Sequence, residues 1–125
     1  MPARTRTLIS LALSALALAA CGGEQPTVRE RTGNFSVTLD DDLIRPQSIR
    51  VPGGGRLRVE VTNGGRLGHT FRIRSANHNV LALTTIEPGE TKFSRSFRLA
   101  KGTYRMYCVL ANHEELGMYG TLVVG

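Results

Sequence analysis

The sequence contains few residues that cross-link a chain or bind a metal: its 125 residues include two cysteines, three histidines and three methionines. It also lacks a convincing amphipathic helix, because apolar residues do not recur at the spacing of a helix face. With 41% hydrophobic residues, the chain is long enough for one compact domain with a modest core. A second domain is not expected.

No apolar run is long enough to span a membrane and remain there as a helix. The longest, LISLALSALALAA at residues 8–20, follows two arginines and has the length of an export signal. It ends in LAAC, which resembles the box of bacterial lipoproteins, whose cysteine receives the lipid. We therefore expect a lipoprotein signal peptide at residues 1–20 and lipidation at Cys21; the alternative is an ordinary signal peptide followed by a chance cysteine.

A lipid on Cys21 places the protein outside the cytoplasm, anchored to a bacterial membrane in the periplasm or at the cell surface. Residues 21–33 include the polar, glycine-rich stretch GGEQPTVRERTG and are expected to be a flexible tether to a domain at residues 34–125. Only Cys108 is then left, so no intramolecular disulfide can form. An unpaired thiol in an oxidising compartment needs protection.

Runs of basic residues are missing as well. The formal net charge is +6, but the lysines and arginines stand singly along the chain, and the protein is expected to be exported. Nucleic acid is therefore excluded as a partner, whereas an acidic protein or anionic lipid fits this charge. We expect a monomer.

What the sequence does contain is a two-residue alternation of apolar and polar residues. It is clear at residues 35–39, 49–51 and 57–61, and glycine or proline interrupts it about every ten residues, as in a β-sandwich or barrel. At residues 91–99 the alternation places Phe93 and Arg95 on the same side, which either a bulge or an edge position explains. The three aspartates at residues 40–42 lack the spacing of a calcium loop and are expected to form a solvated turn.

Alternation in two further strands predicts inward-facing metal donors. In HTFRIR the arginines face water, so His69 faces inward; in TYRMYC Arg105 marks the exposed side, so Met106 and Cys108 face inward. His113 and Met118 follow Cys108 in a loop before the last strand at residues 121–124. One thiolate, two imidazoles and a thioether form the donor set of a blue-copper site.

The segment GTYRMYCVLANHEELGMYGTLVV resembles the closing pattern of the cupredoxins, the family of plastocyanin, azurin, rusticyanin and sulfocyanin. The upstream segment VTNGGRLGHTFRI is similar to the strand, turn and first histidine of that family. The resemblance implies an all-β, Greek-key β-sandwich or barrel with about seven to eight strands. It also implies one copper ion per chain, alternating between Cu(I) and Cu(II), with His69, Cys108, His113 and Met118 as ligands.

Thr70 stands where azurin and plastocyanin often have an asparagine that connects the two ligand loops. A threonine hydroxyl can also make this connection, and such hydrogen bonds orient ligands and tune the metal. The resemblance further implies that electrons pass through the exposed edge of His113 to a redox protein such as a c-type cytochrome or a terminal oxidase. The expected docking residues are Leu110, Ala111, Glu114, Glu115 and Leu116.

The two glutamates are expected to form a negative spot that steers a positively charged partner, although an ordinary solvated role is the alternative. Membrane-anchored electron transfer is the function that we expect, with a copper carrier or buffer as the main alternative and a metal-free interaction module as a third. An enzyme is not expected, because a second copper centre needs more histidines than His78, the one left over. His78 is expected in an exposed loop, and Met106 in the core.

Overall fold

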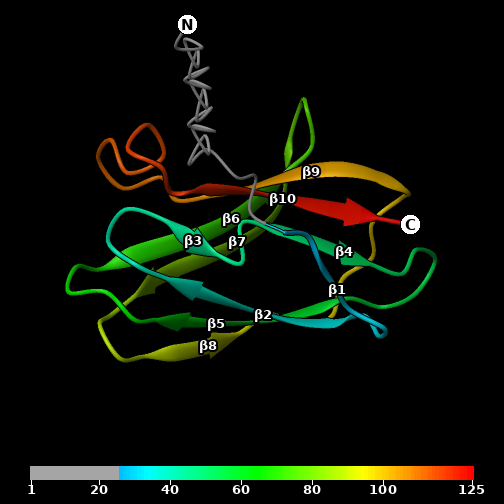
Figure 1. The fold of residues 1–125 in the computed structure, drawn as a ribbon, viewed down its shortest axis with the longest axis horizontal. Coiled ribbons are helices and arrows are strands. Elements are labelled where there is room, and N and C mark those ends of the chain that lie inside the picture. Colours follow the sequence, from blue (N-terminus) through cyan, green and yellow to red (C-terminus); the bar gives the residue numbers. More distant parts are fainter. Residues whose placement is uncertain (1–25) are drawn as a thin grey trace, which may run out of the picture.

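The computed structural model describes residues 26–125, which form two β-sheets packed face to face (Figure 1). The larger sheet has the strand order β1 (Val28–Arg29), β4 (Ser48–Val51), β10 (Tyr119–Val124), β9 (Gly102–Tyr107), β6 (His69–Arg74) and β7 (Asn79–Ile86). The smaller sheet has the order β3 (Ile44–Arg45), β2 (Asn34–Leu39), β5 (Arg58–Asn63) and β8 (Thr91–Phe93). The expected all-β sandwich is confirmed.

The predicted signal peptide, Cys21 and the first part of the tether lie outside the described residues. Between residues 26 and 125 there is no helix long and apolar enough to cross a membrane. The described part has ten strands rather than seven or eight, because β1 and β3 are pairings of only two residues each. Strand β1 also lies within the expected tether, yet it pairs in parallel with β4, and Glu30 N–H donates to the Arg50 carbonyl at 2.9 Å. The folded part therefore begins before Asn34.

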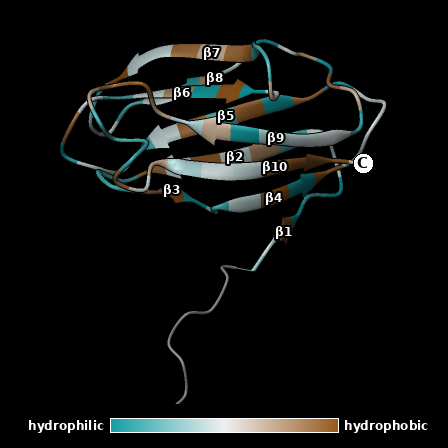
Figure 2. Ribbon diagram, turned by 90° about the horizontal axis from the view of Figure 1, so that it is seen from above, coloured by the Kyte–Doolittle hydropathy of each residue, from teal (hydrophilic) through white to brown (hydrophobic). Residues whose placement is uncertain are grey.

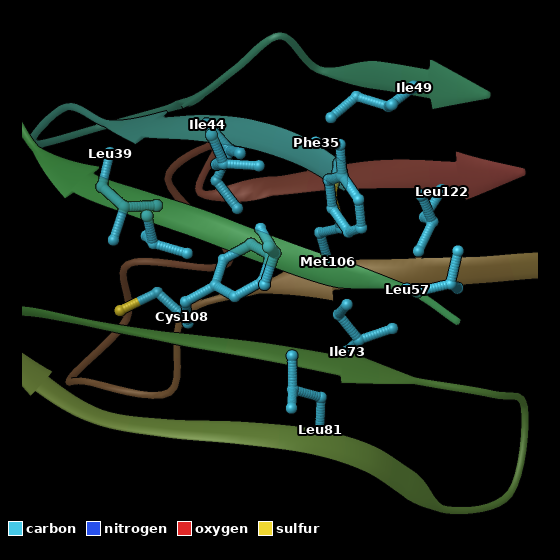
Figure 3. Packing of buried hydrophobic residues seen from close by; sticks show 14 of the residues in the cluster. Phe35, Leu39, Ile44, Ile49, Leu57, Ile73, Leu81, Met106, Cys108 and Leu122 are labelled. Atoms are coloured by element: carbon cyan, nitrogen blue, oxygen red, sulfur yellow. The ribbon is translucent and has the colours of Figure 1, made fainter. Parts of the chain in front are cut away.

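The core forms because alternate residues of each strand point between the sheets. Phe35, Val37 and Leu39 of β2 are at most 3% exposed, and Val59 and Val61 of β5 are fully buried. Figure 2 shows hydrophobic and hydrophilic residues following one another along the strands, and Figure 3 shows side chains from both sheets meeting in one cluster. Met106 belongs to this cluster, as expected.

At residues 91–99 the expectation that Phe93 faces the core is wrong. Phe93 is 56% exposed, and Ser94 points inward, where its hydroxyl accepts a hydrogen bond from Val59 N–H at 3.0 Å. Phe93 and Arg95 thus share the outer side of the chain. Of the bulge and the edge position, the register supports the bulge: Phe93 pairs with Glu60 but Phe97 pairs with Leu57, so the chain has one extra residue between these two pairs. Phe97 therefore returns to the inner side and packs against the core.

The strand order brings three loops to one end of the sandwich. Strand β9 lies between β10 and β6, so the loop after β9 meets the loop before β6. The turn after β2 reaches the same end, because β2 runs parallel to β5. At the left of Figure 1 these are the orange loop at residues 108–118, the green loop at residues 64–68 and the turn at residues 40–42, which we call the acidic turn.

Candidate metal centre

His69 and Cys108 meet because their strands are antiparallel neighbours. Arg72 of β6 pairs with Tyr107 of β9, so the beginning of β6 lies beside the end of β9. His69 is the first residue of β6, and Cys108 directly follows β9; both are buried, with exposed fractions of 0% and 1%. The inward direction that strand alternation predicts for both side chains is what the structure has.

The loop at residues 108–118 folds back and brings His113 and Met118 beside Cys108. Cys108 N–H donates to the Met118 carbonyl at 3.2 Å, and Met118 N–H donates to the His113 carbonyl at 2.9 Å. The loop turns at Ala111, whose φ is 45°, and at Gly117, whose φ is 126°. Met118 is fully buried, whereas His113 is half-buried and closer to the surface.

Three donor atoms converge at this point. His69 Nδ1 and His113 Nδ1 are 3.2 Å apart, His113 Nδ1 is 3.7 Å from Cys108 Sγ, and all three atoms lie within 4.8 Å of one another. Two nitrogens bound to one ion at the tetrahedral angle lie about 3.3 Å apart, and a nitrogen and a sulfur about 3.6 Å apart, if the bond lengths of zinc sites are used. The three side chains are therefore spaced as ligands of one metal ion.

Thr70 connects the two strands at the thiol. Its backbone N–H donates to Cys108 Sγ at 3.4 Å and its hydroxyl donates to the same sulfur at 3.5 Å. The hydroxyl also accepts a hydrogen bond from Val109 N–H at 3.0 Å. Two donors thus face the sulfur, which stabilises negative charge there and keeps Cys108 in place.

The acidic turn, which is expected to be a solvated turn, contributes a residue to the site. Asp41 Oδ1 accepts hydrogen bonds from Arg66 N–H at 2.8 Å, Leu67 N–H at 3.0 Å and His69 Nε2 at 3.1 Å. The Leu67 N–H is the largest cause that holds the pKa of this carboxyl below its ordinary value, and the bonds from His69 and Arg66 act in the same direction. Asp42 is exposed, as expected for the whole turn.

Asp41 could not be found from the sequence, because its histidine partner lies 28 positions away. The only signal was the run of three aspartates, which has no metal-binding spacing. Asn63 fixes the intervening loop as well: its amide donates to the Leu67 carbonyl at 2.7 Å and to the Ile86 carbonyl at 2.8 Å. The loop that leads into His69 is therefore held on two sides.

Glu114, next to His113, is paired with two arginines. Its Oε1 accepts from Arg74 at 2.8 Å and from Arg105 at 2.6 Å. Each of these arginines also stacks over a tyrosine ring, at 4.3 Å from the centroid. The expected negative spot is corrected here, because two positive charges offset Glu114 and leave Glu115 as the exposed acidic residue of the loop.

The remaining candidates lie as follows. Ala111 and Leu116 are exposed, the latter at 61%, whereas Leu110 is half-buried and packs against the core. Leu67, from the neighbouring loop, is 52% exposed. His78 is exposed in the turn after β6, at the end of that strand opposite to His69, where its Nδ1 lies 3.1 Å from the Ser75 hydroxyl.

The match to a protein family covers nearly the whole chain, since residues 9–124 match the family described as a cupredoxin-like domain. The chain is a cupredoxin. The resemblance noted in the closing segment and around His69 is thereby confirmed. No curated protein sequence matches this cupredoxin.

Solved structures agree with this fold. An auracyanin from the photosynthetic bacterium Roseiflexus castenholzii is 16% identical, with 77% of this cupredoxin and 99% of that chain covered and a TM-score of 0.68. Rusticyanin from Thiobacillus ferrooxidans is 19% identical, with 79% and 82% covered and a TM-score of 0.62. A multicopper oxidase is 22% identical with a TM-score of 0.57; the match covers 73% of this cupredoxin but only 41% of the oxidase. At such identities these likenesses concern the fold alone.

Proposed function

We propose that this cupredoxin is a mononuclear type 1 copper protein that carries single electrons between extracytoplasmic redox partners. The observation that carries the proposal is the convergence of two imidazole nitrogens and one thiol sulfur within 4.8 Å at one end of the sandwich. We assign Met118 as the fourth donor, because the family pattern places a methionine there; the residue is fully buried, and its backbone is hydrogen-bonded to Cys108 and His113.

The donor set fits copper better than other common metals. Hard cations such as calcium and magnesium take oxygen ligands, whereas thiolate, imidazole and thioether groups are soft to borderline donors. Two histidines and a cysteine with one methionine are the ligands of blue-copper sites. His69, Cys108 and His113 would hold the ion, with Met118 as the weak axial ligand.

A bound copper ion would supply the redox chemistry by alternating between Cu(I) and Cu(II). The chain supplies ligands that need little movement when the charge changes. Cys108 is held by Thr70, the loop at residues 64–68 is held by Asn63, and the loop at residues 108–118 is closed by its own backbone hydrogen bonds. Prearranged ligands favour fast electron exchange, because the surrounding groups reorganise little.

The names of the related structures support a redox role. One auracyanin is described as reduced with dithionite, one rusticyanin as reduced, and another rusticyanin as a copper protein. The multicopper oxidase match spans less than half of that enzyme, and of the three histidines of this chain two belong to the donor cluster and the third, His78, is exposed elsewhere. Catalysis by this chain alone is therefore not part of the proposal.

We propose that partners dock at the loop around His113. Ala111 and Leu116 are exposed there and Leu110 is half-buried, which provides a small apolar surface of the kind used in brief redox encounters. Glu115 would be the acidic group that orients a positively charged redox protein, such as a c-type cytochrome or a terminal oxidase. Glu114 would act differently, by holding the loop to the sheet.

The proposed location is the outer face of a bacterial membrane or the periplasm. The lipoprotein box at Cys21 is the support for this, with residues 22–27 as the link to the first described strand. Lipid attachment would keep this electron-transfer protein close to membrane-bound redox proteins and limit its diffusion to the plane of the membrane.

The test is the visible spectrum of the domain, expressed from residue 22 onward, after addition of Cu(II). An intense blue or green colour that bleaches on reduction is expected, and Cys108→Ala should abolish it. Tight Cu(I) binding without colour would favour the copper carrier instead. A carrier that delivers copper needs an open site, whereas His69, Cys108 and Met118 are buried here. If neither ion binds, the proposed function is wrong.

A further inference from the structure

Asp41 makes a direct contact to a donor histidine from a third loop. Its Oδ1 lies 3.1 Å from His69 Nε2, while Nδ1 of the same ring lies 3.2 Å from His113 Nδ1. The His69 side chain is fully buried and the Asp41 side chain is 37% exposed. The carboxylate therefore approaches the donor ring from its solvent side, opposite to the metal donors.

Backbone groups hold this carboxylate in position. Oδ1 accepts from two successive N–H groups of the loop at residues 64–68, so the same oxygen receives three hydrogen bonds. The approach is possible because residue 65 is glycine: a Cβ there would lie 2.2 Å from Asp41 Oδ1. The acidic turn also touches the other loop, since a Cβ on Gly117 would lie 2.6 Å from the Asp42 carbonyl oxygen.

This contact decides which nitrogen of His69 carries the proton. A carboxylate has no hydrogen to donate, so a hydrogen bond at 3.1 Å requires the proton on Nε2. The Nδ1 lone pair then points at the donor cluster, where His113 Nδ1 and Cys108 Sγ also lie. That is the tautomer a metal ion needs from this ring.

We propose that Asp41 is a positioning residue of the metal centre: through the Nε2–H···Oδ1 hydrogen bond it selects the metal-binding tautomer of His69 and strengthens the ring as an electron donor. This inference rests on the proposed copper site. The carboxylate's negative charge favours the more positively charged state of the centre, so Asp41 stabilises bound Cu(II) more than bound Cu(I). It thereby lowers the reduction potential.

Two substitutions separate the charge from the hydrogen bond. Asp41→Asn keeps an oxygen that can accept the three hydrogen bonds but removes the charge, and Asp41→Ala removes both. The matched control is Asp42→Asn, which removes an exposed charge one position further along the same turn. Folding of each full-length chain, purified in detergent, is checked by far-UV circular dichroism before any metal is added.

The first measurement is the reduction potential together with the separate affinities for Cu(I) and Cu(II). For Asp41→Asn we expect Cu(II) affinity to fall about tenfold relative to Cu(I) affinity, which is a rise of about 59 mV for a one-electron couple. For Asp41→Ala we expect a loss of about 10- to 100-fold in Cu(II) affinity, the usual effect of removing such a partner. In the control Asp42→Asn, the reduction potential and the Cu(II) affinity should change by only a small fraction of the change in Asp41→Asn. Equal shifts in the two asparagine variants would show a general charge effect and overturn the proposal.

The second measurement does not depend on copper. The ¹⁵N chemical shifts of His69 in the metal-free protein report which ring nitrogen carries the proton, and we expect Nε2–H in the wild type and in Asp42→Asn. In Asp41→Ala, Nδ1–H should become populated. If the chain binds no copper but the tautomer still shifts, the proposed function fails and the role of Asp41 in orienting His69 stands. If His69 keeps the same tautomer in Asp41→Ala, the role assigned to Asp41 is wrong.

Discussion

Thr70→Val tests the connection between the two strands that carry the metal donors. The side chain of Thr70 is nearly isosteric with valine and is 5% exposed as a residue. Its hydroxyl makes two contacts: it donates to Cys108 Sγ at 3.5 Å and accepts from Val109 N–H at 3.0 Å. The substitution removes both contacts and leaves the backbone bond from Thr70 N–H to the sulfur in place.

The expected loss of stability follows from these contacts. Removing a buried hydrogen-bond partner costs about 1–3 kcal/mol when the other group is left unsatisfied. Val109 is 40% exposed, so water can reach its N–H, and the lower part of the range applies, about 1–2 kcal/mol. For a folded part of this size, that lowers Tm by about 5–10 °C.

In the copper-loaded protein, the reduction potential and the visible spectrum test the same contacts. Fewer hydrogen bonds to the thiolate leave more electron density on the sulfur, which favours Cu(II), so the reduction potential should fall and the charge-transfer band should move. Thr70→Ser keeps the hydroxyl and should restore most of both properties. The reasoning is refuted if Thr70→Val melts within 1–2 °C of the wild type and has its potential, or if Thr70→Ser is affected as strongly as Thr70→Val.

Three other substitutions give further tests. Glu114→Gln removes the charge that pairs with Arg74 and Arg105, and should lower the free energy of unfolding by about 0.5–1 kcal/mol at low salt and by less in 1 M salt; a salt-independent loss would contradict this. Gly117→Ala places a Cβ 2.6 Å from a carbonyl of the acidic turn at a φ of 126°, so urea denaturation should show a loss of more than about 1 kcal/mol, and an unchanged midpoint would count against the predicted strain. Ile73→Val trims a fully buried side chain away from the donors, and should cost about 0.5–1.5 kcal/mol in the same assay while the copper spectrum stays unchanged; a shifted spectrum would mean that the core and the site are coupled.

Much of the donor cluster could be predicted from the sequence, because its signals are local. Strand alternation has a period of two, so the arginines at positions 72, 74 and 105 fix the outer face and send His69 and Cys108 inward. The spacing of Cys108, His113 and Met118 within one loop is also local. Periodicity does not show that His69 and the later segment with Cys108 belong to one site; the resemblance to a family predicts it.

Errors arose where a side chain's role depends on its neighbours in space. Alternation places Phe93 in the core with Phe97, but a one-residue bulge lies between them, so Phe93 faces outward and Ser94 faces inward. The sequence suggests a negative spot at Glu114 and Glu115 or a solvated role for both, but two arginines on neighbouring strands pair with Glu114. Neither a bulge nor an ion pair across strands can be read from the pattern of one segment, because both depend on the neighbouring strand.

The sequence by itself thus determined the class of fold, the inward direction of the donor side chains and the chemical types of those donors. Only the tertiary structure decided that the acidic turn closes over the site, with Asp41 bonded to a histidine 28 positions away. The physical reason is that strand alternation is a property of a few adjacent residues. A contact between three loops depends instead on strand order and on backbone approaches that only glycines at positions 65 and 117 permit.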